Sequence, residues 1–126
     1  LAAVARSDAE AEDKVRLGVH TLVAALADDP AMARVILVEA VGATPEIERA
    51  RQAARAGFSA LIKGEMRRFE GWQGASDEEI SIVALATMAA VAETVSHLVA
   101  TDGLKDPGAA AGHLAAYALR ALTPPD

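Results

Sequence analysis

The sequence contains four recognisable helix starts, and they constrain the fold more than any other feature. Proline at the first helical position follows a helix-capping residue at Asp29-Pro30, Thr44-Pro45 and Asp106-Pro107. A fourth start has the spacing of a capping box, in which Ser76 and Glu79 bind each other's backbone N–H groups. These signals predict an all-α chain.

The periodicity of the apolar residues and the positions of helix-stopping residues divide the chain into helices. Val15, Val19 and Leu22 lie on the apolar stripe of the first helix, for which Ser7 is the expected cap. The glycines on either side of Trp72 place a loop after the third helix. We predict five helices, at about residues 8–27, 30–40, 45–69, 77–101 and 107–122.

The composition indicates one globular domain with a core of small side chains. The chain has 126 residues and is 52% hydrophobic, but only 3% aromatic, so its apolar mass is mostly Ala, Val, Leu and Ile. Such a core leaves room for an internal pocket unless large residues interleave with the small ones. The 18 acidic and 12 basic residues give a formal charge of -6, which opposes nucleic-acid binding by this chain alone.

Location is constrained only weakly by the sequence. The chain has no cysteine, which excludes disulfides, and no segment resembling a signal peptide, so a cytoplasmic location is the default expectation. Residues 80–101 are long enough to cross a membrane. Their small polar residues make them weakly hydrophobic, and Glu93 lies among them, so we interpret them as a helix buried between protein neighbours, with no membrane partner.

The last two helices carry more apolar surface than one small chain can easily cover. The fourth has Ile80 and Val91 on one face and Ile82 on another, while the fifth is rich in small residues that permit close helix approach. His113 and Tyr117 lie one turn apart, where they could bond across a twofold axis. A patch of this size predicts a homodimer. The expected interface residues are Ile82, Leu85, Ala89, Val99, Ala111, His113, Leu114, Ala115, Tyr117, Ala118 and Leu122.

Three segments also carry a family resemblance. Residues 25–40 contain Asp28-Asp29-Pro30 leading into an apolar helix, Thr44-Pro45-Glu46 opens a long helix, and residues 97–103 end the penultimate one. In order and spacing these segments resemble the C-terminal regulatory domain of TetR-family transcriptional regulators. The resemblance covers nearly the whole chain.

The resemblance implies a five-helix orthogonal bundle whose last two helices form a four-helix dimer interface. It also implies that residues 1–6 end a linking helix from a DNA-binding domain that this chain lacks, and that residues 7–126 form a regulatory, ligand-binding and dimerisation domain. DNA would then be bound only through the missing helix-turn-helix domain. Repression would be relieved by a small-molecule effector held among the first four helices.

The sequence shows no catalytic motif, so we expect neither enzyme activity nor a metal or other cofactor. Glu93 and His97 lie four residues apart, which differs from the Glu-x-x-His spacing of carboxylate metal bundles. They form either a helical ion pair or the polar lining of a pocket or interface. His20 beside the first stripe and Glu39 at the end of the second helix raise the same question, with solvent exposure as the alternative.

The large side chains of this aromatic-poor chain are either core residues or pocket lining. Because binding pockets are lined mainly by aromatic and apolar groups, Phe58, Phe69 and Met88 are pocket candidates, and Trp72 is placed to cap a pocket mouth. The predicted ligand-binding residues are His20, Glu39, Phe58, Phe69, Trp72, Met88, Glu93 and His97. The alternative function is a helical dimerisation or protein-interaction module that fills its core and binds no ligand.

Overall fold

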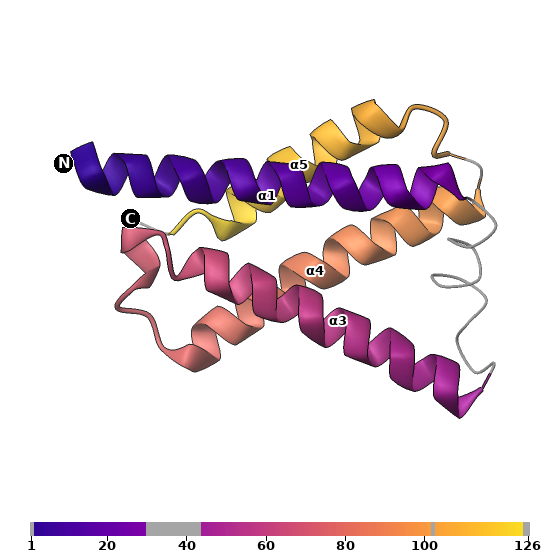
Figure 1. The fold of residues 1–126 in the computed structure, drawn as a ribbon, viewed down its shortest axis with the longest axis horizontal. Helices are drawn as coiled ribbons and strands as arrows, with labels where there is room; N and C mark the ends of the chain where they lie inside the picture. The colour runs from indigo at the N-terminus through magenta and orange to yellow at the C-terminus, as the bar shows by residue number, and fades with distance from the viewer. Residues whose placement is uncertain (1, 30–43, 102, 125–126) are drawn as a thin grey trace.

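The fold is all-helical over the residues that the structure describes. The computed structural model describes residues 2–29, 44–101 and 103–124, and no strand occurs among them. They form helices α1 (Ala2–Asp28), α3 (Pro45–Met66), α4 (Asp77–Ala100) and α5 (Pro107–Leu122), with the short 3-10 helix η2 (Glu70–Trp72) after α3 (Figure 1). The all-α prediction is confirmed. The helix predicted at about residues 30–40 lies outside the described residues.

The predicted starts of α3, α4 and α5 are confirmed by the helix bounds and, for α4 and α5, by their capping groups. Helix α3 begins at Pro45. The Ser76 hydroxyl accepts a hydrogen bond from the backbone N–H of Glu79 at 3.1 Å, and the Asp106 carboxylate accepts one from Ala109 at 3.0 Å. Each bond satisfies one of the backbone donors that the first turn of a helix leaves without a partner.

Two predicted helix bounds are wrong. Helix α1 is continuous from Ala2, so Ser7 lies inside the helix and does not cap it. The alanines in this stretch favour helix strongly enough to outweigh the capping preference of serine. Helix α3 ends at Met66, before the predicted bound near residue 69. The chain turns there because Phe69 and Trp72 are both buried in the core.

The helices form two layers. In Figure 1, α1 and α3 lie in front of α4 and α5. Helix α1 packs along α5, α3 packs against α4, and α4 also contacts α5. Helices α1 and α3 approach each other near the end of α3 and diverge towards the other end of the bundle (Figure 1). This divergence leaves the space in which the candidate site lies.

The buried side chains form two clusters, one towards each end of the α4–α5 pair. The first gathers around the connection between α3 and α4, and its members are Ala11, Val15, Met66, Phe69, Trp72, Ile80, Ala84, Ala118 and Leu122. The second contains Val23, Val91, Val95, Val99, Ala111 and Leu114. Both clusters hold the inner faces of α4 and α5 against α1.

The connection between α3 and α4 is tied to both neighbouring helices. The Arg67 guanidinium donates to the backbone carbonyls of Trp72 at 3.2 Å and Ala75 at 3.1 Å, and it pairs with the Asp77 carboxylate in the first turn of α4. The buried Trp72 indole donates to the carbonyl of Leu122, the last residue of α5, at 2.6 Å. These bonds fix the end of α5 against the start of α4.

Helix α4 is the one helix in the described part of the chain that is long and apolar enough to cross a membrane. Its most apolar window has a mean hydropathy of 1.7, and 33% of that window is buried inside the fold. Its buried residues recur every three or four positions and contribute to both core clusters, which places one face of the helix against the rest of the fold. The structure therefore gives no clear membrane span.

Candidate ligand groove and exposed helix face

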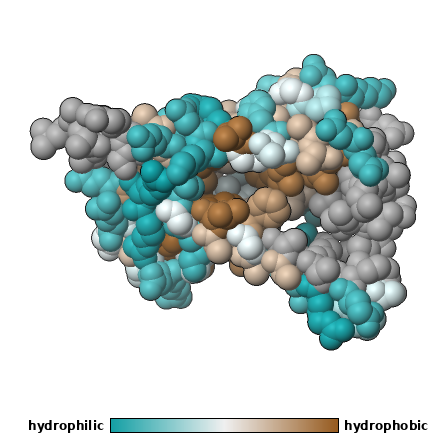
Figure 2. Space-filling model, viewed as in Figure 1, coloured by the Kyte–Doolittle hydropathy of each residue, from teal (hydrophilic) through white to brown (hydrophobic). Residues whose placement is uncertain are grey.

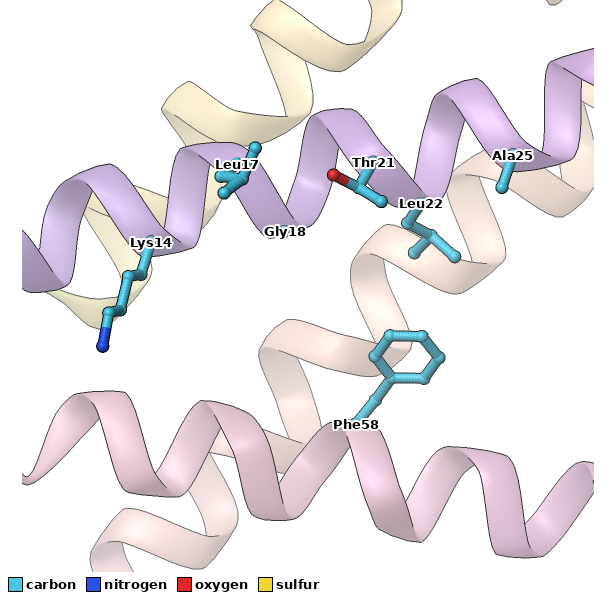
Figure 3. Close-up of a pocket in the computed structure, with 7 residues that line it drawn as sticks. All are labelled: Lys14, Leu17, Gly18, Thr21, Leu22, Ala25 and Phe58. Carbon is cyan, nitrogen blue, oxygen red and sulfur yellow. The ribbon is translucent and has the colours of Figure 1, made fainter.

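A groove of about 440 Å³ lies between α1 and α3. The groove is open to solvent, and its volume falls within the range of roughly 300–1,000 Å³ found for small-molecule sites. The described residues that line it are Lys14, Leu17, Gly18, Thr21, Leu22, Ala25 and Phe58 (Figure 3). All but Phe58 come from α1. Figure 3 shows Phe58 rising from α3 towards Leu22 and Ala25 on α1.

The groove exists because α1 has two apolar faces, of which the core covers one. Ala11, Val15 and Val23 are buried against the rest of the bundle. The residues that line the groove recur every three or four positions, which places them on one side of the same helix. Leu17 is 67% exposed. Figure 2 shows the face of the molecule on which α1 and α3 lie. Hydrophobic side chains gather in the middle of that face, and hydrophilic residues lie above and to the left of them.

Gly18 lies in the middle of this face of α1 and has no side chain to fill the groove. A Cβ atom added there would meet nothing within 4 Å. Glycine inside a helix costs about 1 kcal/mol relative to alanine, because its backbone is more flexible in the unfolded chain. Glycine at this position therefore lowers the stability of α1 and leaves the groove unfilled beside it.

Charged side chains meet where α1 and α3 approach each other. Lys14 Nζ lies 3.8 Å from Glu65 Oε1, and Arg68 Nε lies 3.8 Å from Glu65 Oε2. Arg68 also donates to Glu10 Oε2 at 3.3 Å. Two cations and two carboxylates therefore alternate across this end of the groove. Such partly exposed pairs contribute little to stability, about 0–1 kcal/mol each.

The predicted ligand-binding residues lie in several separate places. Phe58 lies in the groove. His20 is exposed on α1, and Glu93 and His97 are exposed on α4, and none of the three is among the described residues that line the groove. The core residues of this set are Phe69, Trp72 and Met88, all buried. Glu39 lies outside the described residues.

Sequence reasoning missed the six groove residues on α1. Their helical spacing is visible in the sequence, because Lys14, Leu17, Thr21 and Ala25 share a helix face beside the stripe that is buried in the core. Which of the two faces stays open depends on where α3 and α5 pack, and one helix taken alone does not contain that information.

The predicted interface residues divide between two sides of α4 and α5. Ile82 and Leu85 are 60% and 56% exposed, and Tyr117 is also exposed. Ala89 and His113 are exposed beside them. We call these five residues the outer face. The remaining predicted residues are buried within the chain itself, namely Val99, Ala111, Leu114, Ala115, Ala118 and Leu122.

Neither metal chemistry nor a known relative identifies the site. Among the described residues, no group of three His, Asp or Glu side chains is placed to hold a metal ion. No protein-family model, curated protein or solved structure matches this chain. The groove and the outer face are therefore the two surfaces of the described residues that could bind a ligand or a partner.

Proposed function

We propose that this chain is the ligand-binding and dimerisation domain of a TetR-like transcriptional regulator, a cytoplasmic repressor that senses a small apolar or amphipathic effector. The observation that carries the proposal is the groove between α1 and α3, which has the volume of a small-molecule site and an almost wholly apolar lining. Removing an apolar ligand from water would contribute roughly 25 cal/mol for each Å² of apolar surface buried.

The outer face supports dimerisation. Six large hydrophobic side chains of the described residues are exposed; three lie on α1 and α3, and the other three are Ile82, Leu85 and Tyr117 on α4 and α5. Ala84 and Ala118 belong to the same buried cluster, so the outward residues next to them lie at the same level of the bundle. A second copy that packed the same face against this one would cover them in a symmetric four-helix contact.

The packing of the helices suggests how the two sites communicate. The groove lies between α1 and α3, α1 packs along α5, and α3 packs against α4. A ligand that favours a wider separation of α1 and α3 would therefore shift the relative placement of α4 and α5 in the dimer. In the intact regulator this population shift would change the separation of two DNA-binding domains joined before α1.

Two measurements test this proposal. A thermal-shift screen against hydrophobic metabolites and drugs should find compounds that raise the midpoint of unfolding, because a ligand held only by the folded state stabilises it. Sedimentation at tens of micromolar should show a dimer. A screen without any stabilising compound, or a monomer at that concentration, would count against the corresponding half of the proposal.

A second candidate function is a protein-interaction module without a ligand. Its support is the exposure of Leu17 and of Leu61, which is 68% exposed on α3, because both would also suit contact with a helix of another protein. Under this reading the thermal-shift screen finds nothing, while the dimer persists.

A further inference from the structure

The groove carries its charge at one end. Lys14 is the one charged side chain among the described residues that line it, and Thr21 supplies the one hydroxyl. The remaining lining is hydrocarbon from Leu17, Leu22, Ala25 and Phe58, with bare backbone at Gly18. A ligand that matches this lining has one polar end and a long apolar remainder.

The ammonium group of Lys14 is held only loosely by Glu65 and could exchange it for another anionic partner. Its distance of 3.8 Å from Glu65 Oε1 is longer than a hydrogen bond, and its side chain is 51% exposed. A head group bound there would keep part of its hydration while the rest of the ligand leaves water.

The neighbouring charges allow the exchange of partners. Glu65 also lies 3.8 Å from Arg68 Nε, so its carboxylate keeps a cation nearby when Lys14 turns towards a ligand. Arg68 in turn stays hydrogen-bonded to Glu10 at 3.3 Å. A bound anion would therefore add one negative charge to this group of two cations and two carboxylates. It would pair with Lys14, the cation that lines the groove.

We propose that the groove binds a single-chain anionic amphiphile, with its carboxylate at Lys14 and its hydrocarbon tail lying over Gly18 and against Leu22 and Phe58. The inference rests on the proposed ligand-binding function and names the chemical class of the effector. Lys14 and Ala25 are separated by about 16 Å along α1, at about 1.5 Å per residue. That length suits an acyl chain of medium length.

The test compares three probes that share one tail and differ in the charge of the head group: decanoate, decanol and decyltrimethylammonium. Each is titrated calorimetrically into the 126-residue chain, below its micelle concentration and at neutral pH. Decanoate should bind most tightly. Lys14→Gln should weaken decanoate binding about two- to fivefold, as for an exposed ion pair, and should leave decanol binding unchanged.

Two controls locate the effect. Lys105→Gln removes the same charge from an exposed position in the loop before α5 and should leave all three affinities unchanged. Gly18→Leu places a side chain in open space in the groove and should reduce the binding of decanoate and decanol alike. Added salt should weaken decanoate binding to the unsubstituted chain more than to Lys14→Gln.

The possible results separate the two proposals. If decanol binds in the groove and decanoate binds no more tightly, or if Lys14→Gln leaves decanoate unchanged, the anionic class is wrong while the ligand-binding function stands. Tightest binding of decyltrimethylammonium overturns the anionic class as well, and points to Glu65 or Glu10 as the head-group partner. If none of the three probes binds, the groove does not hold a single-chain amphiphile and this inference fails, whereas the thermal-shift screen still decides whether the chain binds a ligand of another class.

Discussion

Replacing Gly18 with alanine should make the protein more stable. The residue lies in the middle of α1, and an added Cβ would meet nothing within 4 Å, so the substitution gains helix propensity without any clash. The propensity difference is about 0.8–1.0 kcal/mol. For a chain of this length, that gain should raise the midpoint of thermal unfolding by about 3–5 °C.

Gly57→Ala is the matched control for this prediction. Gly57 lies inside α3, does not line the groove, and also has open space where an alanine methyl group would lie. Both variants should gain the same stability when melted at equal protein concentration and followed by far-ultraviolet circular dichroism. If Gly57→Ala gains stability and Gly18→Ala loses it, the space beside Gly18 is occupied in the folded protein, and the groove is not open.

Three further substitutions test other parts of the structure. Trp72→Phe leaves the carbonyl at the end of α5 without its indole donor and should cost about 1–3 kcal/mol in a urea titration followed by circular dichroism; an unchanged midpoint would refute the importance of this bond. Gly71→Ala should destabilise the chain by about 1–3 kcal/mol, since its methyl group would overlap the Pro124 ring, and a gain like that at Gly18 would contradict the packing described for this connection. Leu85→Glu on the outer face should convert the dimer to a monomer in sedimentation, whereas Leu61→Glu on α3 should not; equal effects would place the dimer contact elsewhere.

The helix starts were predictable because their signals are local. Pro45 and Pro107 fix the backbone at the first helical position, and Ser76 binds a backbone group three residues along the chain. None of these interactions depends on the rest of the fold. The start of α1 was missed because the same local logic at Ser7 competes with a run of alanines, and the alanines favour a longer helix.

Which face of each helix is buried and which stays exposed was less predictable, because burial depends on how the other helices pack. Met88 and Phe69 are as apolar as Phe58, and the sequence does not distinguish the two that are buried in the core from the one that lies in the groove. The same limit applies to α5, whose Tyr117 is exposed while Leu114, one turn earlier, is buried. The packing of α1 along α5 and of α3 against α4 decides which residues face inward and which face outward.

Amide chemical-shift mapping during a decanol titration tests most directly whether a small molecule binds between α1 and α3. We predict saturable shifts that are largest at Gly18, Thr21, Ala25 and Phe58, the residues around the groove. Shifts that saturate only on the outer face, around Leu85 and the residues beside it, would contradict binding in the groove, as would a titration without saturable shifts.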